Sequence, residues 1–414
     1  MWRMADAETI LRDLFDAAVA AASPARVIPP HLPVPPRGRV VVVGAGKAAA
    51  AMARAVEANW PGPLDGFVVT ATGHGVPCRR IAVVEAAHPM PDEAGRRAAQ
   101  RALDLVSGLT EDDLVLALIS GGGSALLTLP APGITLADKR AVTSALLRSG
   151  ASISEINAVR KHLSAIKGGR LAAAAAPARI VTLVISDVPG DDPATVASGP
   201  TLPDPTTFAD ARAVIAKYAI ELSDRTRHRL DSLADETPKR LDRAEAIVVA
   251  RARDSLDAAA QRARKIGIEP IVLGDDLQGE ARELGAAHAR LALQAKAPSV
   301  ILSGGETTVT IGEGAAGSGG RNTEYLLGLA LALDGARRVF ALACDTDGID
   351  GDAEAAGAVL RPGSLRGARS LGLDPAAILA GHDSRRLFAA LGDLVVTGPT
   401  RTNVNDFRAM LILP

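Results

Sequence analysis

Short apolar runs, many of them rich in valine and isoleucine, alternate with longer Ala/Leu-rich segments, and this alternation constrains the fold more than any other feature. Several runs are apolar at consecutive positions, as strands covered on both faces of a sheet must be. The alternation is typical of α/β proteins, so we predict largely parallel sheets flanked by helices. The predicted strands span residues 39–44, 66–70, 113–120, 179–186, 245–250, 270–274, 299–304, 338–344 and 393–398.

The chain is long enough for two domains. Its 414 residues exceed the size at which a single hydrophobic core keeps growing. The charged, helix-rich stretch 207–243 ends a block rich in glycine motifs and precedes a new series of strands, so it is the best candidate for a junction. We therefore predict an N-terminal, Rossmann-like α/β domain over residues 1–235 and a C-terminal α/β domain over residues 236–414.

Composition excludes several classes of protein. The 46 basic and 47 acidic residues create no overall field that would attract nucleic acid or an anionic membrane. Cys78 and Cys344 are too few and too far apart in sequence for a disulfide framework or a zinc site. The amphipathic N-terminus carries charges where a signal peptide has none, and no apolar run approaches the roughly 18 residues that span a bilayer. We expect a cytoplasmic protein that binds small molecules, and the sequence leaves open whether it is a homo-oligomer.

The segments that follow the predicted strands combine glycine with a hydroxyl, a cation or a carboxylate. In such sheets, ligands bind beyond the carboxyl ends of the strands. The pattern is too regular for generic turns, so we expect a binding site there. The segments are GAGKAA after the first strand, SGGGSALL after the third, DVPGDD after the fourth, GET after residue 304 and DTDGIDGD after residue 344.

The motifs occur in the same order in both halves of the chain. The first half contains SGGG, KGGR, SDVPGDD and SGPT, and the second contains SGGE, SGGR, CDTDGIDGD and TGPT. Two interpretations are open: the halves are structurally related, or two glycine-lined walls face one cleft. Unrelated strand orders would reject the first interpretation. In the second half the candidate substrate- or nucleotide-binding residues are Ser303, Gly304, Gly305, Glu306 and Asn322.

The SGGGSALL segment is a candidate anion site. It follows a strand and opens a predicted helix, so its backbone N–H groups can converge on an anion at the helix N-terminus. Glycine permits close backbone approach and the positive φ angles of an anion-binding nest. The alternative is a tight strand-to-helix turn packed for geometry alone. The candidate residues are Ser120, Gly121, Gly122, Gly123 and Ser124.

The GAGKAA segment fits the G-x-G-x-x-A form of a dinucleotide fingerprint through Gly44, Gly46 and Ala49. A nicotinamide enzyme would normally carry an acidic residue at the end of its second strand, but that strand here ends VVTATGHG. Lys47 lies inside the loop instead, as a point charge suited to phosphate or carboxylate. The alternative is a solvated surface lysine, although a cation at a helix start is unfavourable unless an anion offsets it.

Two clusters of aspartates follow predicted strands. Magnesium usually keeps several waters and needs only one or two carboxylates plus phosphate oxygens, so Asp187, Asp345 and Asp347 are candidate ligands. Asp187 could instead accept a hydroxyl proton, and the second cluster could be an Asx-rich turn. An EF-hand is not indicated, because the twelfth position from Asp345 is Ala356. The clusters contain Asp187, Asp191 and Asp192, and Asp345, Asp347, Asp350 and Asp352.

Phosphoryl transfer fits these cations, glycine loops and carboxylates best, because it depends on positioning and charge neutralisation more than on covalent chemistry. The chain has neither a P-loop motif nor a G-x-S-x-G serine, and no H-x-x-x-H spacing that would support zinc. His74 and His88 lie in loops, where structural hydrogen bonds are a more common role than substrate contact.

A set of motifs resembles the glycerate 2-kinase family, the class II glycerate kinases, whose C-terminal half is known as the leucine-rich multi-organism fragment. The match runs in order from about residue 10 to the C-terminus and is specific as a set. The motifs are GAGKA, HPMPDEAG, SGGGSALL, INAVRKHLSAIKGGRLA, ISDVPGDD, SGPT, SGGETTV, GGRNTEYLL, DTDGIDGD and GPTRTNVND.

The resemblance implies ATP-dependent phosphorylation of D-glycerate at its 2-hydroxyl, giving 2-phosphoglycerate and ADP. It also implies magnesium as cofactor and an active site in the cleft between two α/β domains. The family's glycine-turn lysine falls on Lys47, its cleft arginine on Arg321, and the aspartate of its S-D motif on Asp187. Thr323 departs from the family, where glutamine is common at this position.

Our hypothesis is that Lys47 and Arg321 face each other across the cleft and neutralise the transferring phosphoryl group and the glycerate carboxylate. Asp187 would orient or deprotonate the 2-hydroxyl. One alternative is a hydroxypyruvate reductase with NAD(P)H bound at residues 44–49, which the missing acid on the second strand disfavours. Another is a non-catalytic sensor of phosphorylated metabolites, which would have little use for the aspartate clusters.

Overall fold

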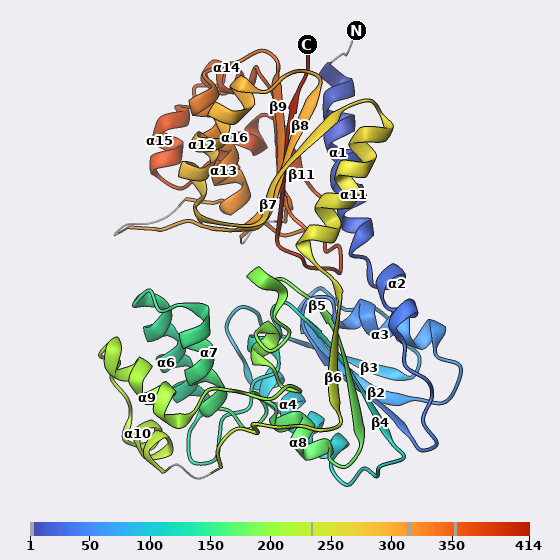
Figure 1. The fold of residues 1–414 in the computed structure, drawn as a ribbon. Helices are drawn as coiled ribbons and strands as arrows, with labels where there is room; N and C mark the ends of the chain where they lie inside the picture. Colours follow the sequence, from blue (N-terminus) through green and yellow to red (C-terminus); the bar gives the residue numbers. More distant parts are fainter. Residues whose placement is uncertain (1–3, 233–234, 313–316, 352–353) are drawn as a thin grey trace. The chain divides into compact units, whose positions relative to one another are not determined.

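The computed structural model describes residues 4–232, 235–312, 317–351 and 354–414, which form two compact units (Figure 1). The doubly wound unit comprises residues 24–250, and the mixed-sheet unit comprises the segment up to residue 23 together with residues 251–414. These limits differ from the predicted boundary at 235/236. Strand β6 (Ala244–Ala250) extends the first sheet by pairing with β5 (Arg179–Ile185), whereas helix α1 (Met4–Ala21) packs on the second sheet.

The doubly wound unit contains an all-parallel sheet with the strand order β3-β2-β1-β4-β5-β6. This is the order of doubly wound nucleotide-binding folds, in which the winding reverses between β1 and β4 and opens a crevice at their carboxyl ends. The prediction of a Rossmann-like first sheet is confirmed. Its other strands are β1 (Val40–Ala45), β2 (Asp65–Ala71), β3 (Ile81–Ala86) and β4 (Leu114–Ser120).

Two of the hydrophobic clusters in the described part of this unit form its larger cores. One lies against the sheet, where Val41 and Val115 pack with apolar residues of the α4 and α8 helices. The other lies among helices α6, α7, α9 and α10, and includes Leu146 and Phe208. The helices are α2 (Pro24–Val27), α3 (Ala49–Asn59), α4 (Glu93–Val106), α5 (Gly123–Leu126), α6 (Leu136–Arg148), α7 (Ile153–His162), α8 (Arg170–Ala175), α9 (Phe208–Lys217) and α10 (Asp224–Asp231), with 3₁₀ turns η1 (Pro29–His31), η2 (Pro189–Asp191) and η3 (Val196–Ser198).

Local sequence explains why the α6, α7 and α9 helices begin where they do. Each has a capping box, in which a Ser or Thr side chain accepts the N3 backbone N–H and an acidic N3 side chain accepts the N–H of the cap residue. The pairs are Thr135 with Asp138, Ser152 with Glu155, and Thr207 with Asp210. These caps position α6 and α7, which carry part of the site described below.

The mixed-sheet unit has the strand order β11-β10-β9-β12-β8-β7. The pairings make β7, β8, β9 and β11 point one way and β10 and β12 the other. Among the described strands, only β7 and β8 pair in parallel, and the other four neighbouring pairs are antiparallel, so this sheet is mixed, whereas the prediction was a largely parallel one. Because this order differs from that of the first sheet, the interpretation of two related halves is wrong. The strands are β7 (Glu269–Glu280), β8 (Ser299–Thr308), β9 (Val339–Asp345), β10 (Gly357–Leu360), β11 (Leu394–Val395) and β12 (Asp406–Ile412).

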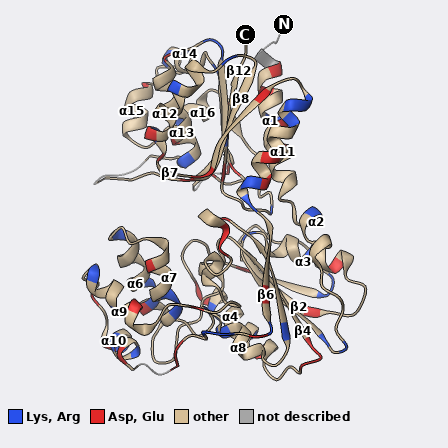
Figure 2. Ribbon diagram, viewed as in Figure 1, with Lys and Arg blue, Asp and Glu red and all other residues tan. Residues whose placement is uncertain are grey.

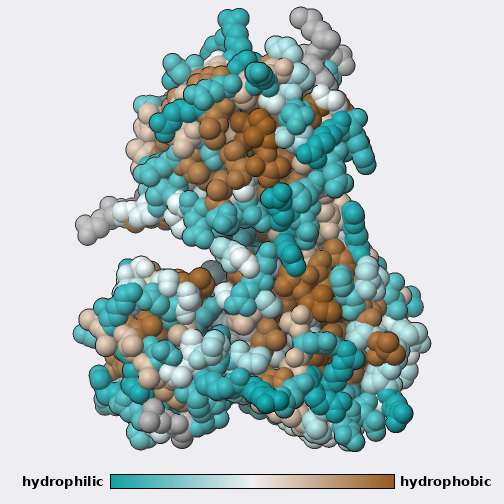
Figure 3. Space-filling model, in the orientation of Figure 1, coloured by the Kyte–Doolittle hydropathy of each residue, from teal (hydrophilic) through white to brown (hydrophobic). Residues whose placement is uncertain are grey.

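Helices cover both faces of the second sheet (Figure 1). The α1 and α11 helices pack on one face, where Leu11 and Phe15 meet Phe407, and the remaining helices cover the other. The face in Figure 3 has a hydrophobic area on the mixed-sheet unit, where α12 and the edge strand β7 expose several aliphatic side chains. The helices are α11 (Ala252–Lys265), α12 (Ala281–Gln294), α13 (Arg321–Leu333), α14 (Ser364–Ser370), α15 (Pro375–Ala380) and α16 (Ser384–Ala390).

Among the helices in the described residues, none is both long enough and apolar enough to cross a membrane.

Candidate functional site

The loop after β1 packs against the loop after β4, at the crevice of the doubly wound sheet. The N–H of Lys47 donates to the carbonyl oxygen of Gly121 at 2.8 Å, and the N–H of Ala48 donates to the buried Oγ of Ser120 at 3.0 Å. Gly46 has φ +134°, and a side chain there would overlap the Ser120 hydroxyl. The glycine is therefore needed for this close approach of the two loops.

The backbone donors of the fingerprint loop are engaged within the unit. In addition to the bonds from Lys47 and Ala48, the N–H of Gly46 donates to Val69 at 3.1 Å and that of Ala49 donates to Gly46 at 3.1 Å. A dinucleotide fingerprint uses the tight turn and the helix N-terminus to hold a pyrophosphate. These packing contacts are enough to explain why glycine occurs at these positions, and a bound ligand is not needed for that explanation. For Gly44, a Cβ would lie 2.6 Å from the carbonyl oxygen of Leu118.

The loop after β4 brings a histidine and a lysine together. Gly122 has φ +80°, and a Cβ at this position would lie 3.1 Å from the His88 ring and 3.3 Å from Cγ of Lys47. Gly123 begins α5, which has only four residues. A helix this short adds little dipole to an anion site, and anion binding by this loop stays a prediction.

A cavity of about 310 Å³ adjoins this loop within the doubly wound unit. It lies between the loops after β3 and β4 and the helices α6 and α7, on which Figure 2 shows basic residues. Its lining includes two segments that the sequence analysis singled out, one containing His88 and the other Gly122 and Ser124. The lining residues are His88, Pro89, Met90, Pro91, Gly122, Ser124, Ala125, Thr128, Lys139, Arg140, Thr143, Ser144, Leu147, Arg160 and Lys167.

The cavity is strongly basic. The described residues that line it include Lys139, Arg140, Arg160 and Lys167 but no Asp or Glu. Lys139 is 6% exposed, and among the described residues its Nζ has no hydrogen-bond partner. Burial and the nearby charge of Arg160 lower the pKa of Lys139 from 10.5 to about 7. Burial and the charges of Lys139 and Arg160 lower the pKa of Lys167 well below its ordinary value.

A backbone segment with strained geometry supports one wall of the cavity. Ala197 and Ser198 have φ angles of +53° and +60°, which non-glycine residues rarely adopt. The Ala197 carbonyl oxygen accepts a 3.2 Å bond from Nζ of Lys167, and the Ser198 hydroxyl lies 2.8 Å from that of Ser124. Ser198 also donates to Asn157 on α7 at 2.9 Å. These bonds fix the positions of Lys167 and Ser124.

Asp187 lies at the same edge of the sheet as Lys47. It follows the end of β5 by two residues and is half-buried. Ile185 pairs with Ser120 of β4, and Ile119 of β4 pairs with Ala45 of β1, so the three neighbouring strands end at one edge. Asp192 of the same cluster accepts bonds from Ala194 and Thr195 and so stabilises its own turn.

In the mixed-sheet unit, the structure places Arg321 at the start of α13 among three carboxylates. Its Nε donates to Asp406 at 2.8 Å, Nη1 to Glu306 at 2.5 Å and Nη2 to Asp345 at 2.7 Å. Burial lowers the pKa of Arg321, but the charges of these three carboxylates outweigh it and raise the pKa well above its ordinary value. The sequence did not indicate these three partners. Three of the five guanidinium N–H groups of Arg321 therefore donate to carboxylates of the protein itself.

A second arginine holds the Arg321 group in place. Arg408 on β12 is 1% exposed and donates to Asp406 at 2.5 Å and to the Gly304 carbonyl oxygen at 2.9 Å. Asp406 therefore lies between two guanidinium groups. Because burying a charge costs free energy unless it is paired, the bond from Arg408 stabilises the Asp406 side chain and holds it toward Arg321.

Asp350 caps the first turn of α13. Its carboxylate accepts the backbone N–H groups of Asn322 at 2.9 Å and Thr323 at 3.0 Å, as well as the Thr323 hydroxyl at 3.0 Å. A side chain on Gly320 would overlap this carboxylate, which explains the glycine directly before Arg321. Burial raises the pKa of Asp350 to about 6, although the bonds from Asn322 and Thr323 oppose the rise.

The SGGE segment does not form a loop. Ser303, Gly304 and Gly305 lie inside β8, which continues to Thr308 and pairs with β7 and β12. Gly305 has φ +103°, and a side chain there would overlap the backbone of Leu277. The predicted glycine-lined wall is therefore, at these residues, a bulged strand pair, and Glu306 contributes through its ion pair with Arg321.

The aspartates predicted as magnesium ligands have structural partners in the mixed-sheet unit. Asp345 and Asp347 are buried, and each accepts a bond from a backbone N–H, that of Asp347 at 3.0 Å and that of Ile349 at 2.8 Å respectively. No group of three potential metal-ligating side chains occurs among the described residues, and Asp352 lies outside them. Buried, locally bonded carboxylates do not fit an open site for a hydrated ion, whereas the half-buried Asp187 fits the chemistry of a single ligand.

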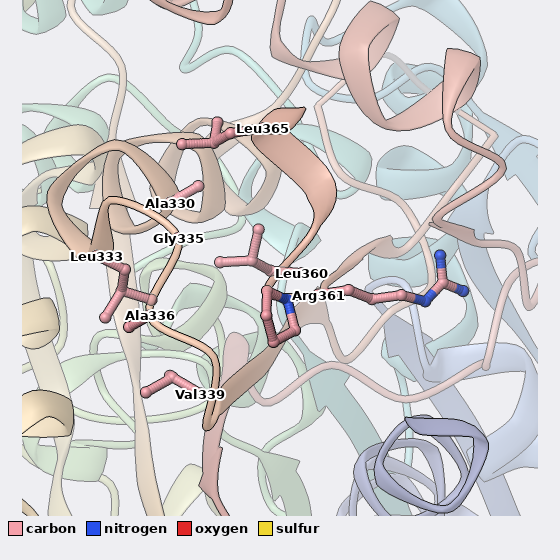
Figure 4. Close-up of a pocket in the computed structure, with 9 residues that line it drawn as sticks. Ala330, Leu333, Gly335, Ala336, Val339, Leu360, Arg361 and Leu365 are labelled. Atoms are coloured by element: carbon pink, nitrogen blue, oxygen red, sulfur yellow. The ribbon is translucent and has the colours of Figure 1, made fainter. Parts of the chain in front are cut away.

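A smaller pocket in the mixed-sheet unit is not a ligand site. It is lined by Ala330, Leu333, Leu360 and other apolar residues, and its volume is about 10 Å³ (Figure 4). That volume is at the limit for a single water. The Arg361 side chain points away from it and pairs with Asp393 and with Glu8 of α1.

Comparisons with known proteins agree with this architecture. Residues 10–231 match the family described as "Domain of unknown function (DUF4147)", and residues 299–406 match the MOFRL family. The "D-glycerate 2-kinase" of Thermotoga maritima is 39% identical over 97% of this chain and 97% of its own length. The chain belongs to the glycerate 2-kinase family. A crystal structure of glycerate kinase from the same organism covers 98% of this chain and 99% of its own chain, with a TM-score of 0.88 and 39% identity.

Names within the glycerate 2-kinase family are not uniform. A protein of Agrobacterium vitis named "Putative hydroxypyruvate reductase" is 57% identical over 99% of this chain and 96% of its own length. The "Glycerate 2-kinase" of Pyrococcus horikoshii is 40% identical over 89% of this chain and 86% of its own length. Sequence similarity alone therefore leaves two named activities, and the choice depends on the site.

Four basic residues of the site were missed as functional candidates. Arg160 and Lys167 lie in the segment INAVRKHLSAIKGGRLA, which contributed to the resemblance, but a run of charges is usually a solvated surface. Two other cations of that segment have carboxylate partners: Lys161 pairs with Asp204 at 3.2 Å and Arg170 with Asp235 at 2.7 Å. The missed residues are Lys139, Arg140, Arg160 and Lys167.

Proposed function

We propose that the protein catalyses ATP-dependent phosphorylation of D-glycerate at the 2-hydroxyl, giving 2-phosphoglycerate and ADP. The names of the relatives from Thermotoga maritima and Pyrococcus horikoshii support a kinase that acts on glycerate. The observation that carries the proposal is the basic cavity beside the crevice of the doubly wound sheet. Phosphoryl transfer needs preorganised positive charge around the phosphates, and this cavity provides it.

We propose roles for three residues. Lys47 contributes positive charge next to the cavity, because its side chain lies beside Gly122 of the lining. Asp187, at the same sheet edge, orients or deprotonates the 2-hydroxyl. Arg321 binds a negatively charged group of a substrate, with its orientation set by Asp406 and Asp345. The joint action of Lys47 and Arg321 in one reaction stays a prediction.

Magnesium, when bound with ATP, would neutralise phosphate charge, and Asp187 is the carboxylate that fits this role best. It is half-buried and follows β5 at the edge where Lys47 lies. As a ligand it could hold the ion only together with phosphate oxygens and water. The same carboxylate cannot be a ligand and a free base at once, so the two roles are alternatives.

The second candidate function is reduction of hydroxypyruvate, which is favoured by the name of the Agrobacterium vitis relative. The loop that would hold NAD(P)H argues against it. The N–H groups of residues 46–49 bond within the unit, and β2 ends without an acidic residue for the ribose hydroxyls.

Two assays on the same preparation test the proposal. ADP release should depend on both D-glycerate and ATP, and should fall by about 10²-fold in Lys47→Ala, the scale of losing one preorganised charge contact. NADH oxidation with hydroxypyruvate should not exceed the blank. Hydroxypyruvate-dependent oxidation of NADH without ADP release would contradict the proposal.

A further inference from the structure

The basic cavity differs from the rest of its unit in having cations without carboxylates. Elsewhere in the doubly wound unit, the buried Lys161 and Arg170 are paired with Asp204 and Asp235. Lys139 is at least as buried as these two, yet among the described residues its Nζ has no hydrogen-bond partner, and no Asp or Glu lines the cavity. Unpaired buried charge is costly, and groups whose pKa is strongly perturbed by burial cluster at functional sites.

The amount of positive charge indicates what kind of anion fits. Arg160 and Lys167 lie with Lys139 around one cavity, and Arg140 adds a fourth cation that donates to the Pro91 carbonyl oxygen. A glycerate carboxylate carries a single negative charge and has too few oxygens and too little charge to engage all four basic groups. A triphosphate carries three to four charges, and lysine and arginine are the usual ligands of its oxygens.

The cavity also has an apolar part. Met90 and Leu147 line it and are 53% and 59% exposed, and Ala125 and Pro91 lie in the same lining. Nucleotide sites commonly combine a few placed polar groups with apolar walls that contact the base. The volume of about 310 Å³ lies within the usual range of small-molecule sites.

We propose that this cavity binds the nucleotide, with Lys139, Arg160 and Lys167 on its phosphate chain and Met90 and Leu147 against its base. The terminal phosphate then lies toward Gly122, beside which the Lys47 side chain is placed. This inference rests on the proposed function in taking the phosphoryl donor to be a nucleoside triphosphate.

Protonation gives the site a measurable signature. In the ligand-free protein Lys139 has a pKa of about 7, and it faces Arg140, Arg160, Lys167 and His88 across the cavity. A bound polyphosphate stabilises the charged form of Lys139, so its pKa rises. At pH 8, binding should therefore take up protons at Lys139 and at Lys167, whose pKa is also lowered by burial, and the uptake should be smaller by up to about one proton when Lys139 is replaced.

The test is calorimetric titration of the full chain with ADP, with tripolyphosphate and with D-glycerate, in buffers of different ionisation enthalpy. The cavity variants are Lys139→Met and Arg160→Met. The matched control is Arg148→Met, which removes one charge from an exposed position on the same helix as Lys139. We expect the cavity variants to weaken ADP and tripolyphosphate binding by about 10- to 100-fold, the scale of a charged hydrogen bond, and the control by less than about threefold. Lys139→Met should also reduce the proton uptake at pH 8 by up to about one proton, whereas Arg148→Met should leave it unchanged.

ADP affinity within about threefold of wild type in both cavity variants would overturn the proposal, as would equal losses in Arg148→Met. Loss of D-glycerate binding alone would overturn it too, and assign the cavity to the hydroxy acid. The experiments distinguish failure of the proposed function from failure of the nucleotide site. ADP binding that depends on Lys139, without phosphorylation of glycerate, would support the nucleotide site and reject the proposed function. Phosphorylation with unchanged ADP affinity in the variants would reject the site alone.

Discussion

Replacing Lys139 by methionine should make the ligand-free protein more stable, although it weakens the proposed nucleotide site. Lys139 is 6% exposed, and its pKa is lowered from 10.5 to about 7 by burial and by Arg160. A pKa unit corresponds to about 1.4 kcal/mol, so the charged side chain costs the folded state at most about 5 kcal/mol. Methionine has a similar length and no charge, and should remove most of that cost.

The pH dependence of the stability difference follows from the direction in which the pKa of Lys139 is shifted. Between pH 7 and 10.5 the unfolded chain keeps the Lys139 proton while the folded protein releases it, so stability rises with pH through this window. Below about pH 7 Lys139 is protonated in both the folded and the unfolded state, so the folded state bears the full free-energy cost of the buried charge. The advantage of Lys139→Met over the wild type should therefore be largest near pH 7 and should shrink toward pH 10.

The assay is urea unfolding of wild type, Lys139→Met and Arg148→Met, followed at several pH values from 7 to 10. Apart from Lys167, whose pKa responds to the Lys139 charge, titration of the other groups is nearly common to the proteins, so the difference in midpoint reports the loss of the Lys139 charge. A Lys139→Met protein that is less stable than wild type at pH 7 would refute the reasoning. So would a stability difference that is the same at every pH.

Four further predictions concern other parts of the site. Arg321→Ala should lower kcat by about 10²-fold or more in steady-state assays, and near-normal turnover would contradict its role in catalysis. A thermal melt of the same variant separates a loss of activity from a loss of stability caused by the missing ion pairs with Asp406 and Asp345. Asp187→Asn should lower kcat by about 10²- to 10⁴-fold if the carboxylate moves the hydroxyl proton, and an unchanged rate would rule out both a base and a metal ligand. Asp350→Ala should lower the free energy of unfolding by about 2–4 kcal/mol, because it leaves buried N–H groups at the start of α13 without an acceptor. A change below about 0.5 kcal/mol, measured by chemical denaturation, would contradict the capping role. Gly122→Ala should impair activity through its positive φ angle and its contact with the His88 ring, and full activity in a well-folded variant would show that this loop adjusts freely.

Much of the first sheet could be predicted because its central strands are buried on both faces and are therefore apolar at most consecutive positions. β3 was missed because it is an edge strand with exposed and half-buried residues at its centre. β12 was missed for the opposite reason. It is fully buried, yet it contains Asp406 and Arg408, and only their ion pairs with each other and with Arg321 make that burial tolerable.

The candidate site could be predicted where the chemistry lies in a local motif and not where it depends on distant partners. Lys47 and Gly122 come from separate motifs, and the structure places them in contact range. The carboxylates around Arg321 come from positions 15 to 85 residues away, which no spacing rule reveals. Likewise, nothing local distinguishes the cavity residue Arg160 from its neighbour Lys161, because the difference is the presence of Asp204 beside the lysine.

The most direct test of the central claim is to incubate the purified protein with D-glycerate, ATP and magnesium and to identify the product by ³¹P and ¹³C NMR. We expect 2-phosphoglycerate in amounts equal to the ADP formed, and no product when ATP is omitted. Formation of 3-phosphoglycerate would contradict the assigned position of phosphorylation. No phosphoglycerate at all, together with NADH-dependent reduction of hydroxypyruvate, would contradict the kinase itself.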